Sequence, residues 1–381
     1  NDNRELSTVL CSVIVPIFNG MDFLPEFYAS LEKARPEAGC EVILVDDCSA
    51  EPVMSCLPSG LADNQLTMLR NTENRGYAAT VNRGLQVAKG DVLFVLNSDL
   101  VLQSDCLHAL LDFLNKNSRV GVVGAKLTAP DSGLIQHAGM AFGRHSRRHV
   151  FLGQQPNHSL CNKVRACQVV TGAIHAFGRQ TRDAVGFLDE RYFNHNEDLD
   201  YCLRARAIGL QNYYLPSAEA AHWESVSGPS RFIGQEEADA LFWTTWGGQV
   251  DTDLRPIADE MVQHLIATGL GASLESFDVL NFCKSLDGDL ILDALRQALP
   301  NAIGSVDRIN PYRLRSQNLS FSMLLPHWWQ DNPRPYLYLV DEIGRLSENW
   351  QWFQQRREVC GPEIIIDANL RHVLVGMSEA T

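Results

Sequence analysis

Short apolar runs alternate with stretches of helical periodicity between residues 11 and 99. The apolar runs have the length of strands, and turn residues such as Asn19 and Gly20 follow them. The predicted strands are residues 11–16, 41–45 and 66–69, and the predicted helices are residues 22–34 and 77–88. Strands that alternate with helices at this spacing predict an α/β fold with a Rossmann-like, mainly parallel sheet flanked by helices.

The segment 91–99 is apolar up to Leu96 and then ends in Asn97, Ser98 and Asp99. Such a run is typical of a strand that is buried on both faces of a parallel sheet. The carboxyl ends of these strands line the ligand crevice of open α/β sheets. We therefore expect Asp99 at the mouth of a crevice, where a carboxylate can hold a divalent cation on a phosphorylated substrate. The alternative is that Asp99 only caps a turn at the strand end.

The loop after the first predicted strand lacks two common nucleotide-binding motifs. Residues 17–20 read IFNG, which contains neither the GxGxxG of dinucleotide-binding proteins nor the GK[ST] of phosphate-binding loops. Glycine-mediated binding of a pyrophosphate is therefore not expected. If the substrate carries phosphates, a metal ion must neutralise their charge, and this again favours a metal site at Asp99.

The length of the chain allows two domains. With 381 residues, of which 45% are hydrophobic, it can bury a sizeable core in each. We expect one domain in residues 1–250 and an accessory region in residues 251–381. The accessory region has helical patterns at 253–268 and 289–299 and strand-like runs at 336–340 and 363–366. These patterns predict an α/β or helical appendage.

Charge and composition narrow the class of protein further. The net charge of −14 argues against general nucleic-acid binding. The ten cysteines show no CxxC pair, so reduced thiols in a cytoplasmic protein are expected. No apolar run approaches the roughly 20 residues of a membrane-spanning helix. The basic segment 143–149 and the aromatic segment 324–329 would allow peripheral contact with a membrane, although a solvated loop and internal packing are the simpler explanations.

Several motifs follow one another in a fixed order. The first half contains VIVPIFN at 13–19, VDDCS at 45–49, NRG at 74–76 and again at 82–84, and GD with NSD between 90 and 99. The second half contains IQHAG at 135–139, VTGA at 170–173, GFLDE at 186–190 and NEDLDYCLR at 196–204. Over residues 10–232 this series resembles the family 2 glycosyltransferases, and the second set is most similar to bacterial transferases that build O-antigen and other surface polysaccharides.

The resemblance implies an inverting, metal-dependent sugar transferase with the GT-A fold. Its donor would be a UDP- or dTDP-sugar, and its acceptor a hydroxyl of a bacterial surface glycan or a lipid-linked precursor. It would act in the cytoplasm or at the inner face of the plasma membrane, alongside other polysaccharide-assembly enzymes. Such an enzyme must neutralise the leaving diphosphate and deprotonate the acceptor hydroxyl, tasks that suit a Mg²⁺ or Mn²⁺ ion and a carboxylate, respectively.

The resemblance also assigns residues to the donor. They are Pro16, Phe18, Asn19, Asp47, Asn74, Gly76, Asn82, Asn97 and Ser98. Asp47 would accept the imide N–H of uracil or thymine, because an ionised carboxylate can only accept; the alternative is an Asx-turn with Ser49. Gly76 either lets the backbone approach a ligand or simply permits a turn.

Metal binding is assigned to Asp99, the last acid of the family's DxD motif, and to His222, for which a structural role is an equal alternative. Asn97 replaces the first acid of that motif, and the loss of one carboxylate should weaken metal affinity. Asp198, with Glu197, matches the catalytic pair, and Asp198 would be the general base. Acids in the first turn of a helix are also favoured by the helix dipole alone. The acceptor side is assigned to Gly172, Ala173 and Trp223.

Three other functions compete with this interpretation. A sugar nucleotidyltransferase would share the sheet but would need a Gly-rich, basic first loop, which is missing here. A glycan-binding module would explain the tryptophans but not the carboxylates at the strand ends. A catalytically inactive sugar-nucleotide-binding scaffold within a polysaccharide-assembly complex would keep Asp47 and Asp99, but it would not need the Glu197-Asp198 pair.

Overall fold

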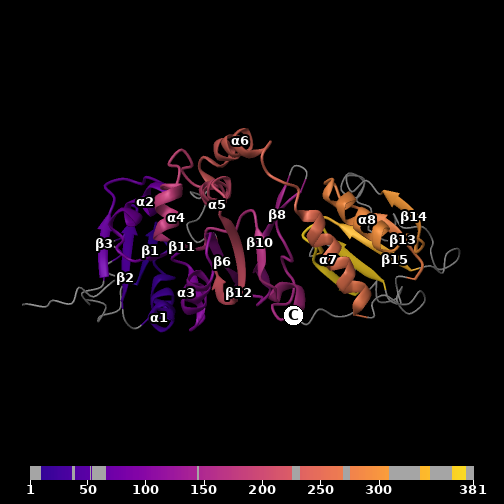
Figure 1. Cartoon of the computed structure of the whole chain (residues 1–381), viewed down its shortest axis with the longest axis horizontal. Helices are drawn as coiled ribbons and strands as arrows, with labels where there is room; N and C mark the ends of the chain where they lie inside the picture. Colours follow the sequence, from indigo (N-terminus) through magenta and orange to yellow (C-terminus); the bar gives the residue numbers. More distant parts are fainter. Residues whose placement is uncertain are drawn as a thin grey trace, which may run out of the picture. The chain divides into compact units, whose positions relative to one another are not determined.

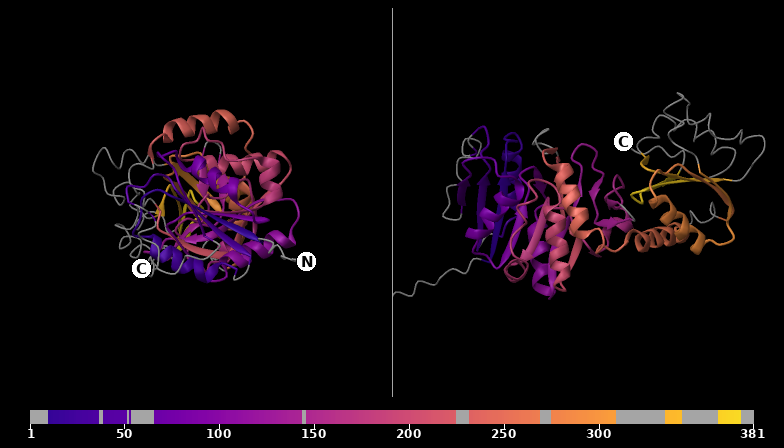
Figure 2. Two further views of the ribbon diagram at one scale, coloured as in Figure 1. Left: turned by 90° about the vertical axis from the view of Figure 1, so that its left-hand side faces the viewer. Right: turned by 90° about the horizontal axis from the view of Figure 1, so that it is seen from above.

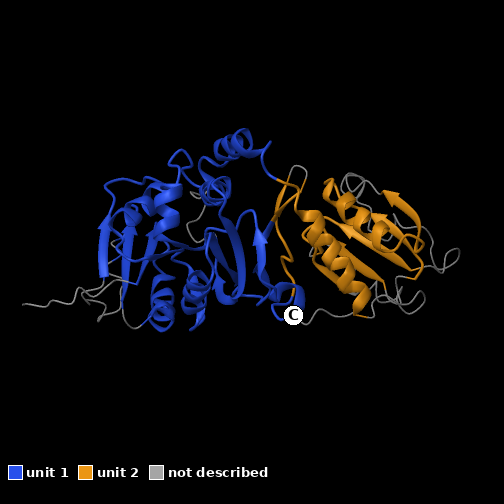
Figure 3. Ribbon diagram, viewed as in Figure 1, with its two compact units in different colours: residues 1–140, 155–250 blue, residues 141–154, 251–381 orange. Residues whose placement is uncertain are grey.

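The computed structural model describes residues 10–36, 39–51, 53, 66–143, 146–224, 232–268, 275–308, 335–343 and 363–374. The chain divides into two compact units (Figure 3). Unit 1 comprises residues 1–140 and 155–250, and unit 2 comprises residues 141–154 and 251–381. The functional roles assigned to these parts of the chain remain predictions.

A mixed sheet forms the centre of unit 1 (Figure 1). Its strands are β1 (Cys11–Ile17), β2 (Cys40–Asp46), β3 (Leu66–Arg70), β4 (Val92–Leu96), β5 (Leu100–Leu102), β6 (Val120–Thr128), β7 (Ile135–His137), β10 (Arg165–Cys167), β11 (Ile174–Gly178) and β12 (Gln211–His222). They run in the order β10-β12-β6-β11-β4-β1-β2-β3, with β5 on β12 and β7 on β6. The N-terminal strands, in indigo and violet, form one end of the sheet (Figure 2).

Strands β3, β2, β1 and β4 are parallel to one another, as are β6 and β12. Strand β11 is the exception at the centre, because it pairs antiparallel with both β4 and β6. Ile17 at the end of β1 lies opposite Asp46 at the end of β2, so the loops that follow these strands leave at the same edge. The predicted α/β class is confirmed, as are the predicted strands and helices of residues 11–96.

Helices cover both faces of this sheet. They are α1 (Leu24–Ala34), α2 (Tyr77–Val87), α3 (Cys106–Lys116), α4 (Arg179–Val185), α5 (Glu197–Ala207) and α6 (Gln235–Trp246), with a short 3-10 helix η2 (Ser159–Asn162). Val13 and Val15 belong to the apolar cluster that α1 and α3 cover, whereas Ile14 faces Gly84 of α2. The alternate residues of β1 are therefore buried on opposite faces, as its unbroken apolar sequence predicts.

Unit 2 is an α/β structure, which settles the choice between an α/β and a helical appendage. Its sheet contains β13 (Phe277–Asn281), β14 (Ile303–Arg308), β15 (Tyr336–Val340), β16 (Ile364–Asp367) and β17 (His372–Leu374), in the order β14-β13-β15-β16-β17. All its pairings are parallel except that of β17. Helices α7 (Leu254–Ala267) and α8 (Asp287–Ala298) pack on each other. The predicted helices and strands of this region are confirmed.

Part of the basic segment has a structural role within unit 2. Residues 140–149 include β8 (Met140–Phe142) and β9 (Arg147–His149), which pair with each other. Arg148 Nε lies 2.6 Å from Oδ2 of the buried Asp287, which also accepts a hydrogen bond from Ser146. Arg148 is thus paired with a carboxylate. Arg144, His145 and the aromatic segment 324–329 lie outside the described residues.

Candidate active site

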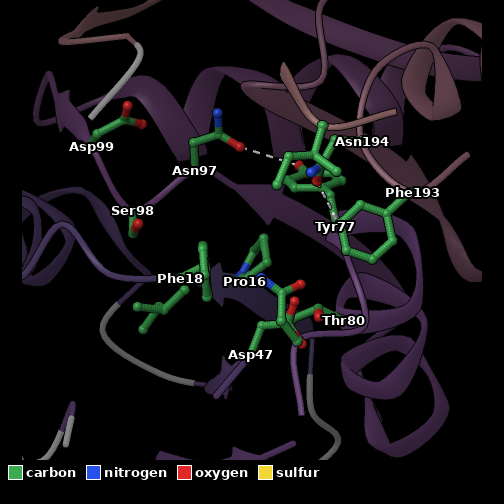
Figure 4. A pocket seen from close by; sticks show the side chains of 13 residues that line it. Pro16, Phe18, Asp47, Tyr77, Thr80, Asn97, Ser98, Asp99, Phe193 and Asn194 are labelled. Carbon is green, nitrogen blue, oxygen red and sulfur yellow. Dashed lines mark hydrogen bonds between the residues drawn. The ribbon is translucent and has the colours of Figure 1, made fainter. Parts of the chain in front are cut away.

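A pocket of about 350 Å³ opens at the carboxyl ends of β1, β2 and β4 (Figure 4). Its volume falls in the range of roughly 300–1,000 Å³ that is typical of small-molecule sites. It is lined by Pro16, Ile17, Phe18, Asp47, Asn74, Tyr77, Thr80, Asn97, Ser98, Asp99, Phe193, Asn194 and Ile233. The expected placement of Asp99 at a crevice is therefore observed, and most of the residues assigned to the donor lie around the same cavity.

Asp47 fixes the loop between β3 and α2. Its Oδ1 accepts hydrogen bonds from Asn71 Nδ2 at 2.7 Å and from the backbone N–H of Arg75 at 2.8 Å. Its Oδ2 accepts the backbone N–H of Gly76 at 2.9 Å. The side chain is buried yet lines the pocket, and a carboxylate has about four acceptor positions. One position therefore remains for a ligand. The Asx-type contact with Ser49 comes from Asp46 instead.

Two residues assigned to the donor, Gly76 and Asn82, make structural contacts. Gly76 has a φ of +82°, and a Cβ atom there would lie 2.4 Å from the carbonyl oxygen of Phe193. The glycine is thus required by the turn and by the close approach of residue 193. Asn82 is buried, and its amide bonds both the carbonyl and the N–H of Leu188 and also Glu190. It ties α2 to the segment 186–190 and does not line the pocket.

Asn19 is also outside the pocket lining. Its backbone lies in the left-handed region with a φ of +57°, its N–H donates to Ser49 Oγ, and its Oδ1 accepts the N–H of Ala50. These bonds join the loop after β1 to the loop after β2, and they position Phe18 and Asp47 at the same edge of the sheet. The geometry thus gives Asn19 the role of a support for the pocket.

Asp99 and His222 lie side by side, with 3.2 Å between Oδ1 and Nε2. The other ring nitrogen of His222, Nδ1, lies 2.8 Å from Gln136 Oε1. Gln136 Nε2 donates to the carbonyl of His222 and to Glu224, which fixes the orientation of its amide. Nδ1 must therefore carry the hydrogen, and the lone pair of a neutral His222 points from Nε2 toward the Asp99 carboxylate. Two acceptors that face each other in this way form a suitable ligand pair for a cation.

Asn97 lies between this pair and α2. Its Nδ2 is 3.5 Å from His222 Nε2, and its Oδ1 accepts a hydrogen bond from the Tyr77 hydroxyl at 3.2 Å (Figure 4). The same hydroxyl lies 3.1 Å from the carbonyl oxygen of Gly172. Tyr77 therefore connects the end of β4 with the loop that precedes β11.

Asp198 sits on the other side of that loop, in the first turn of α5. Its Oδ2 accepts the backbone N–H of Gly172 at 2.7 Å, and its Oδ1 accepts that of Leu199. A Cβ atom on Gly172 would lie 2.7 Å from the Cβ of Asp198, so the contact requires glycine. Asp198 does not line the pocket itself, but it is joined to it through Gly172 and Tyr77.

Glu197 is almost completely buried beside Asp198. Its Oε2 has no hydrogen-bond partner among the residues that the structure describes. Burial, followed by the charge of Asp198, raises the pKa of Glu197 well above its usual range. The surroundings of Glu197 thus disfavour its charged form, while Asp198 accepts two backbone N–H groups. The two acids thus have different environments, and Asp198 is the one whose two carboxylate oxygens both accept hydrogen bonds.

The remaining acceptor-side residues are positioned by their backbones. The carbonyl of Ala173 accepts the N–H of Asn97 at 3.0 Å, and Trp223 N donates to the carbonyl of Asp99 at 3.1 Å. The indole of Trp223 is 41% exposed and packs against Phe23, with 5.7 Å between the ring centroids. Its assignment to the acceptor side remains a prediction.

Sequence reasoning missed several residues of this site. Tyr77, Thr80, Phe193, Asn194 and Ile233 line the pocket, and Gln136 supports His222. Tyr77 follows Gly76 at the start of a predicted helix, so its position beside the crevice could have been inferred. No feature of the sequence signals Ile233, which comes from the segment before α6.

The N-terminal part of the chain resembles known proteins in sequence. Residues 12–175 match the model of the family described as Glycosyl transferase family 2. An uncharacterized protein of Sinorhizobium fredii is 31% identical over 58% of this chain and 25% of its own length. An O-antigen biosynthesis protein of Myxococcus xanthus is 28% identical over 62% of this chain and 18% of its own length. The chain thus spans a quarter or less of these two relatives.

An N-acetylglucosaminyl-diphospho-decaprenol L-rhamnosyltransferase of Mycobacterium tuberculosis is 26% identical over 58% of this chain and 78% of its own length. Among solved structures, a mannosyltransferase of Pyrobaculum calidifontis in complex with GDP-Man and Mn²⁺ aligns with a TM-score of 0.49 and 16% identity. That alignment covers 81% of this chain and 79% of the other. Within the described residues, no helix is long and apolar enough to cross a membrane.

Proposed function

This chain belongs to glycosyl transferase family 2, with the GT-A fold, and from its pocket we propose that it transfers a sugar from a nucleoside-diphosphate donor to an acceptor hydroxyl, with inversion. One observation carries this proposal. Asp47 and Asp99 line a single pocket at the carboxyl ends of β2 and β4, and Asp198 is hydrogen-bonded to a loop that reaches the same pocket through Tyr77.

The donor nucleotide would bind on the Asp47 side of the pocket. Asp47 accepts hydrogen bonds from Asn71, Arg75 and Gly76 and keeps an acceptor position that suits the imide N–H of uracil or thymine. This supports a UDP- or dTDP-sugar. Pro16 and Phe18 supply apolar surface to the nucleotide, and Asn74, Asn97 and Ser98 supply polar groups at the same cavity.

The diphosphate would lie toward Asp99 and His222. Both side chains are buried, and Gln136 holds Nδ1 of the imidazole so that Nε2 is directed to Asp99. These donor atoms fit a Mg²⁺ or Mn²⁺ ion, which would supply positive charge to the leaving diphosphate when bound. Asn97 stands where the family has a second acid, so a single carboxylate would serve the ion.

Asp198 would accept the proton of the attacking hydroxyl. Its hydrogen bonds from the N–H groups of Gly172 and Leu199 fix the orientation of the carboxylate, as the role of a general base requires. The neighbouring Glu197 is buried, and burial raises its pKa, so Asp198 is the better candidate for the base.

The names of the relatives support the proposed acceptor class. One belongs to O-antigen biosynthesis and another transfers rhamnose to a diphospho-decaprenol carrier. We propose that this chain likewise acts on a bacterial surface glycan or its lipid-linked precursor, at the inner face of the plasma membrane and alongside other polysaccharide-assembly enzymes.

Hydrolysis and transfer assays with a panel of UDP- and dTDP-sugars test the proposal. Wild type should release nucleoside diphosphate in a metal-dependent manner. Asp198→Asn should lose about 10²- to 10⁴-fold in kcat while it still binds donor, because a general base contributes about that factor. The exposed Asp112→Asn, which changes a carboxylate on α3 in the same way, serves as the control and should keep full activity.

Asn97 favours one second candidate, the inactive sugar-nucleotide-binding scaffold, because it removes a carboxylate from the metal site. A scaffold would bind donor and be stabilised by it but would show no turnover with any donor. The same assays therefore distinguish the two functions.

A further inference from the structure

Tyr77 contacts both halves of the proposed site, which are the donor side at Asn97 and the side that carries Asp198. It is the first residue of α2, and its ring lines the pocket next to Asn97 and Asn194 (Figure 4). Its hydroxyl lies 3.2 Å from Asn97 Oδ1 and 3.1 Å from the carbonyl oxygen of Gly172. A phenol carries one hydrogen, so these two oxygens share a single donor.

The backbone of Tyr77 is also hydrogen-bonded to the segment that precedes α5, the helix that carries Asp198. Its N–H donates to the carbonyl of Phe193 at 2.9 Å and lies 3.3 Å from Asn194 Oδ1. His195 and Asn196 follow with φ values of +71° and +69°, and α5 then begins at Glu197. Two successive left-handed residues that are not glycine store strain, and such strain persists only where surrounding contacts enforce it.

The two oxygens that share the hydroxyl belong to different halves of the site. Asn97 reaches toward His222 with its Nδ2 and follows β4 in the sequence. Gly172 holds Asp198 through its N–H, and its own backbone would be freely variable without hydrogen bonds because it is glycine. A single phenol thus restrains a donor-side amide and the residue that orients the proposed base.

The surroundings of Tyr77 keep its hydroxyl a donor. Burial, followed by the charges of Glu197, Asp198 and Asp99, raises the pKa of Tyr77 well above its usual range. The phenol therefore stays protonated across the pH range in which enzymes are assayed.

We propose that the Tyr77 hydroxyl is a positioning group that holds the Asn97 amide and the Gly172 backbone together, and thereby sets the separation between the donor diphosphate and the Asp198 base. This proposal rests on the proposed transferase function. Tyr77 acts through Asn97 and Gly172 and not on the reacting atoms, so its removal should impair turnover more than donor binding.

Tyr77→Phe tests the proposal, because it removes the hydroxyl and keeps the ring in the pocket. We expect kcat to fall about tenfold and the donor KM to change by less than about twofold, as for the loss of one hydrogen bond that orients a reacting group. The pH–kcat profile of the variant is compared with that of wild type, because a change in its shape would show that the reacting groups are no longer held in the same surroundings.

Tyr28→Phe is the matched control. Tyr28 is fully buried in the N-terminal core, and its hydroxyl has no partner among the described residues. Its removal deletes a hydroxyl without breaking a hydrogen bond, so it should leave kcat, KM and the pH profile unchanged.

A double-mutant cycle with Asn97→Ala gives a second readout. If Tyr77 acts partly through Asn97, the double variant should lose less kcat than the product of the two single losses. Fully multiplicative losses, or a Tyr77→Phe variant with wild-type kcat and pH profile, would overturn the proposal. A Tyr77→Phe protein that no longer folds would do so too, since the hydroxyl would then serve the fold. If wild type turned over no donor, the transferase function itself would fail, and the Tyr77 proposal with it.

Discussion

His222 Nε2 lies 3.2 Å from Asp99 Oδ1, and both side chains are buried. Because Gln136 Oε1 accepts the hydrogen on Nδ1, a neutral imidazole presents a lone pair to a carboxylate. Gln136 thus orients the imidazole so that Nε2 faces the Asp99 carboxylate.

The first prediction concerns the hydrogen bond between Gln136 and His222. Gln136→Ala should lower the affinity for Mn²⁺ about 10- to 100-fold, because loss of the partner that orients a histidine ligand typically has this effect. Calorimetric titration with MnCl₂ in the presence of UDP measures it. Gln103→Ala, at an exposed glutamine, is the control. Equal affinities in wild type and Gln136→Ala would contradict a metal site at His222.

The second prediction separates two costs at Gly76, the cost of a left-handed backbone and the cost of a steric clash with Phe193. Gly76→Ala should lower the free energy of unfolding by about 3–4 kcal/mol, because it combines a left-handed backbone with a clash against Phe193. Gly133 has a φ of +68°, and a Cβ atom there would meet nothing within 4 Å among the described residues. Gly133→Ala should therefore cost only about 1–2 kcal/mol. Denaturant unfolding of both variants gives the difference, and equal costs would show that Phe193 yields to the added methyl group.

The third prediction is a pH dependence. The pKa of Glu197 is raised in the folded protein, whereas the unfolded value is about 4.3. The folded state therefore binds more protons, and Glu197 destabilises the fold increasingly as the pH rises above about 4. Glu197→Gln removes this cost, so its melting temperature should exceed that of wild type at pH 8, by an amount that shrinks toward pH 4.

Differential scanning calorimetry from pH 4 to 8 measures this trend. The exposed Glu51→Gln should show no such pH-dependent gain. A Glu197→Gln variant that is less stable than wild type at pH 8 would mean that the carboxylate is ionised and has a partner in the fold.

The fourth prediction concerns Asp47. Asp47→Ala removes one acceptor each from the Asn71 amide, which also donates to Thr80, from the N–H of Arg75, and from the N–H of Gly76, which also donates to Asn74. This loss should cost about 2–3 kcal/mol of unfolding free energy. Donor affinity should fall as well, because the loop before α2 loses its anchor. Urea unfolding and UDP titration test both effects against the exposed Asp22→Ala. Normal stability together with lost UDP binding would instead identify Asp47 as a purely ligand-binding residue.

The sequence alone predicts those pocket residues that directly follow the end of a strand. Asp47, Asn97 and Asp99 follow buried apolar runs, and parallel strands bring their carboxyl ends to one edge of the sheet. The alternation of strands and helices also predicts the parallel half of the sheet. These features depend on local periodicity, which is visible in a single sequence.

Partners that are distant in the sequence could not be predicted in this way. Gln136 meets His222, and Tyr77 meets Gly172, only because β11 and β12 bring their loops to the ends of β4 and β6. Nothing in the local sequence indicates that β11 pairs antiparallel with β4 and β6 and lies between them. For the same reason, the bonds from Asn82 to Leu188 and Glu190 are invisible in the sequence, although the residue type is compatible with ligand binding.

Strand β11 also determines when the two parts of the sheet can be joined during synthesis. It separates β4 from β6 and comes from residues 174–178, about eighty positions after β4. In a nascent polypeptide on the ribosome, β11 cannot join β4 to β6 until residues 174–178 have emerged from the exit tunnel. Until then the edge of β4 has no partner, and an exposed apolar edge is a template for aggregation. Slow translation just upstream of residue 174 would prolong this vulnerable interval, and chaperone capture would be most useful there.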